Sequence, residues 1–150
     1  MDAAENKVPP AAAWLGGLGA LPFIGLAGSL PFLVDAPRVF AAHALAAYGA
    51  TILSFLGGIQ WGLAIGPARA SYNPNVLTRL IVSVFPSLVA WTALLSAETI
   101  GLYLLATAVV AMPWVDLRAT RAGHAPRWYP KLRIPLSCVV IAALLFGAMA

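Results

Sequence analysis

Small residues occupy every fourth position along one apolar segment of this chain: Ala42, Ala46, Ala50, Ser54, Gly58, Gly62 and Gly66. A helix in water would not carry so many glycines in its interior, because each costs about 1 kcal/mol relative to alanine. In a bilayer, backbone hydrogen bonds cannot be exchanged for water, and small side chains let a neighbouring helix approach closely. The row therefore predicts a membrane helix on which other helices pack. We assign the packing to its central members, Ala46, Ala50, Ser54, Gly58 and Gly62.

The composition supports several membrane spans. The chain is 61% hydrophobic and 9% charged, whereas a soluble domain has about 25% charged residues. A span needs about 20 mainly apolar residues to cross about 30 Å of hydrocarbon. Five segments meet this requirement, at about 12–34, 41–65, 76–95, 99–115 and 134–150. We predict an all-α fold, a polytopic helix bundle of five transmembrane helices that forms one integral membrane domain over residues 1–150. Prolines 126, 130 and 135 are expected to exclude a long helix before the fifth span.

The basic residues predict the orientation. If the five segments alternate in direction, eight of the nine basic residues share the side of the N-terminus: Lys7, Arg69, Arg79, Arg118, Arg121, Arg127, Lys131 and Arg133. The opposite side has Arg38 alone. Short loops rich in lysine and arginine stay in the cytoplasm. We therefore expect an N-in/C-out multi-pass protein of the bacterial inner (cytoplasmic) membrane, or of the mitochondrial inner membrane in a eukaryote.

The geometry of the small-residue row predicts which helix is central. Four residues advance an α-helix by about 400°, so the row drifts about 40° at each step. It can therefore serve two or three neighbours in turn, which favours segment 41–65 as the centre of the bundle. A shorter row in the first span, Ala12, Gly16, Ala20 and Gly28, predicts a close contact between the first two spans.

Polar residues inside a bilayer are costly and are therefore candidates for function. Here they gather toward the expected cytoplasmic side, and we take as a candidate binding site Gln60, Trp61, Arg79, Asp116, Trp128, Tyr129 and Arg133. We expect Asp116 to pair with Arg79 or Arg133, because a carboxylate near the membrane edge needs a partner. The alternative is that these residues only anchor the bundle at the interface.

Signatures of soluble catalysis are absent from the sequence. It contains no phosphate-binding glycine loop, no CxxC and no HExxH motif. The single cysteine, Cys138, excludes an intramolecular disulfide and offers no metal site by itself. We expect no cofactor, no metal and no nucleic-acid partner, since no basic stripe lies on a soluble face.

Three pieces of sequence resemble a known family. They are Tyr48-Gly49 with Ile52-Leu53-Ser54-Phe55-Leu56-Gly57-Gly58-Ile59 and Trp61-Gly62, then Trp114-x-Asp116, then Trp128-Tyr129-x-x-Leu132-Arg133. This pattern is similar to that of a bacterial membrane family of unknown function related to mitochondrial transmembrane protein sixty-nine. The chain departs from it at Gln60, where the family pattern has a basic residue. The resemblance implies a multi-span inner-membrane protein and supplies no activity.

Three classes of function fit these features. The first is a non-enzymatic membrane protein, a structural or assembly partner of a larger membrane complex, favoured by the small-residue surfaces. The alternative is a small transporter or a lipid- or quinone-binding protein with a cytoplasmic-side site, favoured by the polar cluster and by Pro22 and Pro86 within spans. A membrane enzyme would have to use Asp116 with His124. Expected partners are the bilayer, its anionic lipids, and another membrane protein or a second copy of the chain.

Overall fold

The computed structural model describes residues 6–66 and 76–150, which form five long helices without strands in these ranges. They are α1 (Pro10–Ser29), α2 (Asp35–Ile65), α3 (Val76–Leu95), α4 (Glu98–Arg121) and α5 (Tyr129–Met149), with a 3-10 turn, η2 (Leu30–Phe32), after α1. Each of the five is long and apolar enough to cross a membrane. The predicted all-α bundle of five membrane helices is therefore confirmed.

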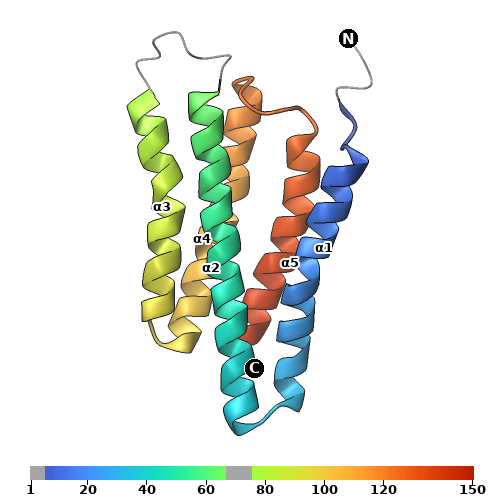
Figure 1. The fold of residues 1–150 in the computed structure, drawn as a ribbon, viewed down its shortest axis with the longest axis vertical. Helices are drawn as coiled ribbons and strands as arrows, with labels where there is room; N and C mark the ends of the chain where they lie inside the picture. Colours follow the sequence, from blue (N-terminus) through green and yellow to red (C-terminus); the bar gives the residue numbers. More distant parts are fainter. Residues whose placement is uncertain (1–5, 67–75) are drawn as a thin grey trace.

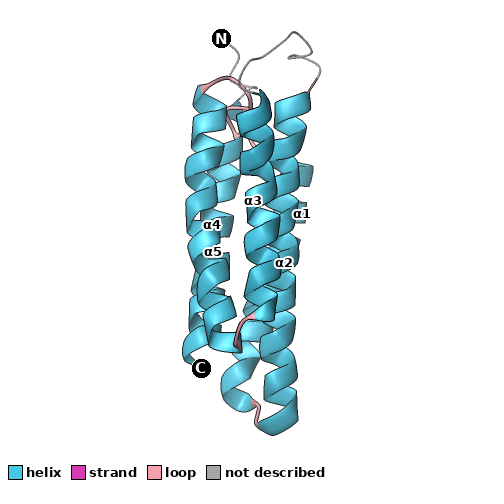
Figure 2. Ribbon diagram, turned by 90° about the vertical axis from the view of Figure 1, so that its left-hand side faces the viewer, coloured by secondary structure: helices cyan, strands magenta, loops and turns pink. Residues whose placement is uncertain are grey.

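The helices run alternately up and down in one bundle (Figure 1), and the second view shows them nearly parallel (Figure 2). The end at which α1 and α5 begin and α2 and α4 finish is called the basic end below. It carries most of the lysines and arginines that the sequence places on the side of the N-terminus, although Arg69 lies outside the described residues. The N-in/C-out orientation stays a prediction from these charges.

Helix α2 is central, as the drift of its small residues predicts. Neighbouring helices pack in the order α1, α5, α4, α3, and α2 contacts all four of them. The core between them includes five leucines that are fully buried: Leu45, Leu53, Leu102, Leu105 and Leu144. In chain order, these leucines come from α2, α4 and α5. A larger share of α2, α4 and α5 is buried than of α1 and α3, which pack on the outside of the bundle, although Phe23 of α1 reaches the core.

The small-residue row lies only partly inside the bundle. Ala46 and Ala50 are buried, Ser54 is half-buried, and Gly58 and Gly62 are exposed. No atom beyond their own helix turn lies within 4 Å of where a Cβ would stand on Gly58 or Gly62. The drift explains this, because the four steps from Ala42 to Gly58 turn the row by about 160°. No helix of the described bundle therefore packs on Gly58 or Gly62, and their expected helix packing stays a prediction.

Among the glycines of α2, Gly57 instead comes closest to the backbone of a neighbouring helix. A Cβ on Gly57 would stand 2.5 Å from the backbone carbonyl oxygen of Ser83 in α3, and 3.4 Å from Pro86. This contact lies beside the proline within α3. The most extensive helix pair is α2 with α3, whereas α1 packs more widely on α5 than on α2. The first two spans do touch, and the Tyr48 hydroxyl donates to the Gly19 carbonyl at 2.9 Å.

Three helices extend beyond the spans expected from the sequence, and α2 begins at Asp35 rather than near residue 41. Helix α4 continues to Arg121, and α5 begins at Tyr129 rather than near residue 134. The expectation that Pro130 and Pro135 exclude helix here is wrong. Pro130 lies in the first turn, where its missing N–H has no acceptor to lose and its fixed φ suits a helix. At Pro135 the helix continues although it forgoes one backbone hydrogen bond.

We expect Gly57→Ala to destabilise the bundle by about 1–3 kcal/mol, because the added methyl group meets a backbone carbonyl that can move only with its helix. The matched control is Gly58→Ala, where the space is open and the change should be neutral or stabilising by up to about 1 kcal/mol. Thermal unfolding of both variants in mild detergent measures the difference. Equal stabilities would show that α2 and α3 are not in contact at Gly57.

Candidate functional site

Asp116 connects three helices at the basic end of the bundle. Its side chain projects from α4 into the core, and the residue is 1% exposed. The Gln60 Nε2 of α2 donates to its Oδ1 at 2.6 Å, and the Arg133 Nε of α5 donates to its Oδ2 at 3.1 Å. We call these three residues the Asp116 cluster. Of the two arginines that the sequence offered as partners for Asp116, Arg133 forms the ion pair.

Helical periodicity brings the cluster together. Each member continues the row of buried residues on its own helix, where members recur three or four positions apart. The row of α4 is Leu102, Leu105, Val109, Met112, Asp116 and Ala119. Gln60 continues the buried row of α2, and Arg133 begins the buried row of α5. Three polar groups therefore meet where an all-apolar sequence would have placed core leucines.

The charge balance within the cluster is neutral. Burying a lone carboxylate or guanidinium is costly, and an ion pair with additional hydrogen bonds offsets this cost. Both carboxylate oxygens of Asp116 are occupied, one by Gln60 and one by Arg133. Arg133 uses its Nε for this pair. Its Nη2 is buried and has no hydrogen-bond partner among the described residues.

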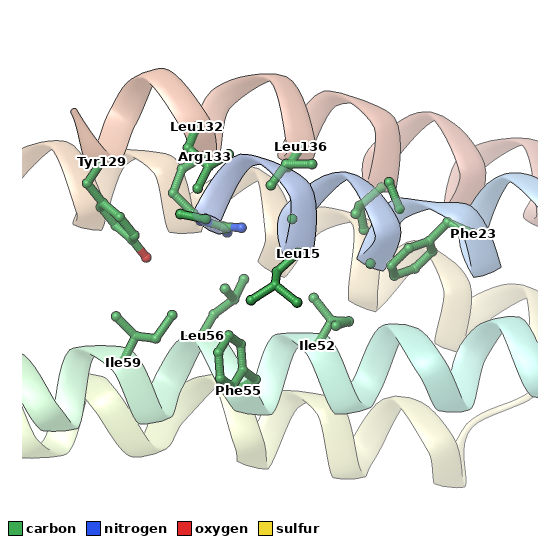
Figure 3. Close-up of a pocket in the computed structure, with 15 residues that line it drawn as sticks. Leu15, Phe23, Ile52, Phe55, Leu56, Ile59, Tyr129, Leu132, Arg133 and Leu136 are labelled. Carbon is green, nitrogen blue, oxygen red and sulfur yellow. The ribbon is translucent and has the colours of Figure 1, made fainter. Parts of the chain in front are cut away.

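A pocket lies beside the cluster, between α1, α2 and α5 (Figure 3). Its volume is about 330 Å³, which is within the range of small-molecule sites. We call it the α1–α2–α5 pocket. Among its lining residues only Tyr129 and Arg133 have polar side chains, and both enter it from α5. The other lining residues are Ala12, Leu15, Gly16, Gly19, Ala20, Phe23, Ile52, Phe55, Leu56, Ile59, Leu132, Leu136 and Val140.

The mouth of this pocket lies on the apolar outer surface. Leu15 of α1 and Phe55 of α2 line the pocket and are nevertheless 71% and 64% exposed. They lie on the two helices that flank the opening (Figure 3). In a membrane this surface faces lipid, because it is part of two spans. The pocket therefore opens sideways toward the bilayer.

The Tyr129 hydroxyl is the second unused polar group of the pocket. It is buried and, like the Arg133 Nη2, has no hydrogen-bond partner in the described part of the chain. Tyr129 and Arg133 are four positions apart on α5, so their side chains lie on the same helix face. The ring of Trp128 packs edge-on against that of Tyr129, with 6.1 Å between centroids. This contact holds the tyrosine at the end of the pocket.

The remaining predicted site residues lie elsewhere. Trp61 is exposed and does not line the α1–α2–α5 pocket, so it is not part of its wall. Arg79 lies on the other side of Gln60, where it lines a second pocket of about 230 Å³ with Arg118 and His124. The structure thus brings Gln60, Asp116, Tyr129 and Arg133 together, with Trp128 behind them.

Sequence reasoning missed the walls of the pocket. The residues that α1 contributes are apolar or glycine, so no polar signal marks them. At the basic end α1 leans away from α2 (Figure 1), and it packs more widely on α5 than on α2. The cation–π contact between Arg118 and Trp114, 3.5 Å from the ring centroid, was also missed. The sequence does indicate this contact, because Trp114 and Arg118 are four positions apart and therefore on the same face of one helix.

The fold and the apolar helices define a multi-pass integral membrane protein. Residues 8–149 match the model of the family described as "Protein of unknown function (DUF3429)", and the chain belongs to this family. It is 34% identical to Transmembrane protein 69 of Xenopus tropicalis over 94% of this chain and 54% of the relative. It is 30% identical to Transmembrane protein 69 of Mus musculus over 75% of this chain and 48% of the relative.

The chain spans about half the length of these curated relatives. No solved structure matches it. The resemblance expected from the sequence is thus confirmed as membership of this membrane family.

The Asp116–Arg133 pair predicts a thermodynamic coupling. Asp116→Ala should cost about 3–5 kcal/mol, because it leaves the buried guanidinium of Arg133 unpaired. The double variant Asp116→Ala/Arg133→Leu should recover part of this loss, since it removes the unpaired charge. Chemical unfolding of the single and double variants in detergent measures the coupling. Losses that simply add would show that the two side chains do not interact.

Proposed function

We propose that this chain is a non-enzymatic membrane protein that binds a lipophilic molecule in the α1–α2–α5 pocket. Its proposed location is the bacterial inner (cytoplasmic) membrane, or the mitochondrial inner membrane in a eukaryote. One observation carries the proposal. Two buried hydrogen-bond donors without partners among the described residues, on Tyr129 and Arg133, lie at the polar end of an otherwise apolar pocket. Buried donors of this kind are costly unless something satisfies them. The excess of basic residues at the basic end supports the N-in/C-out orientation in that membrane.

The position of the pocket suits an amphiphilic ligand. Its polar end is at Tyr129, the first residue of α5, and its apolar end reaches Val140. These positions are separated by about 16 Å along the helix. A polar group bound at Tyr129 therefore lies near the membrane surface, and a tail would extend toward the hydrocarbon. The lateral mouth between Leu15 and Phe55 gives such a molecule a route from the bilayer.

A non-enzymatic role is supported by the way Asp116 is used. Both of its oxygens accept hydrogen bonds within the cluster, so it is poorly placed as a general acid or base. His124, which the sequence offered as its partner, lines the second pocket. A ligand-binding role requires only the donors and the apolar walls. Anionic lipids fit the outer surface of the same end, where Arg127 and Lys131 are exposed beside aromatic residues.

We expect the purified protein to retain a lipid-soluble compound that bulk membrane lipid does not explain. Ala12→Phe should abolish this retention, because the ring fills the pocket from α1. The control is Ala11→Phe, which adds the same ring at an exposed neighbouring position. Extraction followed by mass spectrometry measures the bound compounds. The proposal is wrong if all three proteins release the same lipids in the same proportions.

A structural or assembly role is the second candidate, and one observation favours it. Gly58 and Gly62, one turn apart on α2, leave an open face on the outside of the bundle. Small residues at this spacing allow a helix from another molecule to pack closely in a membrane. The partner we propose is a second copy of this chain, paired through α2. Phe55 lies three and seven positions from these glycines and therefore on the same face of α2, so a second copy packed there would also cover the mouth of the pocket.

The pairing of two copies predicts that Gly58→Leu lowers self-association. The leucine would hold the two α2 helices apart, and the expected loss is about tenfold in dimer affinity, or about 1.4 kcal/mol. Leu63→Ala is the control, because it shortens a side chain outside this face. Cross-linking in liposomes at several protein-to-lipid ratios measures the dimer fraction. A wild-type protein that stays monomeric at every ratio would exclude this candidate.

A further inference from the structure

We infer that the ligand of the α1–α2–α5 pocket is a neutral lipophile that carries a carbonyl group, bound by the Tyr129 hydroxyl and the Arg133 Nη2. This inference rests on the proposed lipophile-binding function and adds the chemical class of the ligand. It follows from the type of polar group in the pocket, from the charge of the cluster behind it, and from the shape of the cavity.

The polar groups of the pocket call for a hydrogen-bond acceptor. A guanidinium has only donors, and a tyrosine hydroxyl donates one proton. Both groups are buried without a hydrogen-bond partner among the described residues. Figure 3 shows the two side chains entering the same cavity from one face of α5. A carbonyl oxygen has two lone pairs and no donor, so it is complementary to these two donor groups.

The charge of the cluster favours a neutral acceptor over an anion. Arg133 is ion-paired with Asp116 at 3.1 Å, and both side chains are at least nine-tenths buried. The positive charge of Arg133 is therefore already balanced at the bottom of the pocket. A carboxylate or phosphate would bring a second negative charge into the same buried site, with one cation for two anions. Such an uncompensated buried charge is strongly unfavourable, whereas a neutral carbonyl uses the free Nη2 without altering the balance.

The shape of the cavity limits how much of the ligand it encloses. A cavity of about 150 Å³ holds a benzene ring, so about 330 Å³ accommodates a ring-sized head and the beginning of a tail. The rest of the tail would leave through the mouth between Leu15 and Phe55 into the bilayer. Two kinds of neutral lipophile carry a carbonyl group of this type. One is a quinone with an alkyl or isoprenoid tail, and the other is a diacylglycerol, whose carbonyl belongs to an ester.

The test compares three probes by calorimetric titration of the full chain in dodecyl maltoside, a neutral detergent without a carbonyl group. The probes are decylubiquinone as a neutral quinone, dioleoylglycerol as a neutral ester, and dodecanoate as an anionic carboxylate. We expect at least one neutral probe to bind one-to-one and at least about tenfold more tightly than dodecanoate. The neutral probe that binds more tightly decides between the quinone and the ester.

Matched variants locate the binding. Tyr129→Phe should weaken binding of the neutral probe about 3- to 10-fold, the effect of one hydrogen bond. Tyr103→Phe, the same change on an exposed tyrosine of α4, should leave it unchanged. Asp116→Asn keeps the shape of the side chain and removes its charge, so Arg133 should then prefer dodecanoate. If Asp116→Asn does not fold, the comparison of Tyr129→Phe with Tyr103→Phe still tests the inference.

Three results would overturn the inference, and only the third would also contradict the proposed lipophile-binding function. Wild-type protein that binds dodecanoate as tightly as the neutral probes would show a lipophile site without the neutral preference. An unchanged affinity in Tyr129→Phe would place the carbonyl elsewhere. Failure of all three probes to bind, together with no retained compound in the extraction experiment, would contradict the proposed function itself.

Discussion

The carboxylate of Asp116 must be satisfied inside an apolar bundle, and this requirement positions the basic end of the molecule. Its two oxygens accept from Gln60 and Arg133 on two different helices. Because a buried charge without its partner is far more costly than the pair, α2, α4 and α5 are held in one register there. The hydrophobic effect that drives apolar burial has no preferred direction. The pair thus supplies a directional constraint that the core lacks.

The α1–α2–α5 pocket is a consequence of this register. The Nε of Arg133 pairs with Asp116, and the same side chain lines the pocket beside α1. Helix α1 packs mainly on α5 and diverges from α2 at this end, so the space between them remains open. A single arginine therefore both closes the core and supplies a donor to the pocket. The polar residues can therefore stabilise the bundle and bind a ligand at the same time, because Arg133 takes part in both.

The sequence predicts the helices well because hydropathy and length decide them, and it predicts an ion pair for Asp116 because a carboxylate there needs a cation. It does not decide between Arg79 and Arg133, because that choice depends on how α4 rotates against its neighbours. The same limit explains Gly57 and Gly58, adjacent glycines of which one meets the Ser83 carbonyl and the other meets nothing. The pocket-lining residues of α1 were missed because an apolar residue that lines a cavity cannot be told from other apolar residues of a span by sequence.

The order of the cluster along the chain has a consequence for membrane insertion. Gln60 precedes Asp116 by 56 positions and Arg133 follows it by 17. If the helices insert in chain order, the carboxylate of α4 can reach the amide of α2 before Arg133 of α5 is present. Gln60 would then be the first member of the cluster to contact Asp116. The arrival of α5 would complete the charge balance of the cluster.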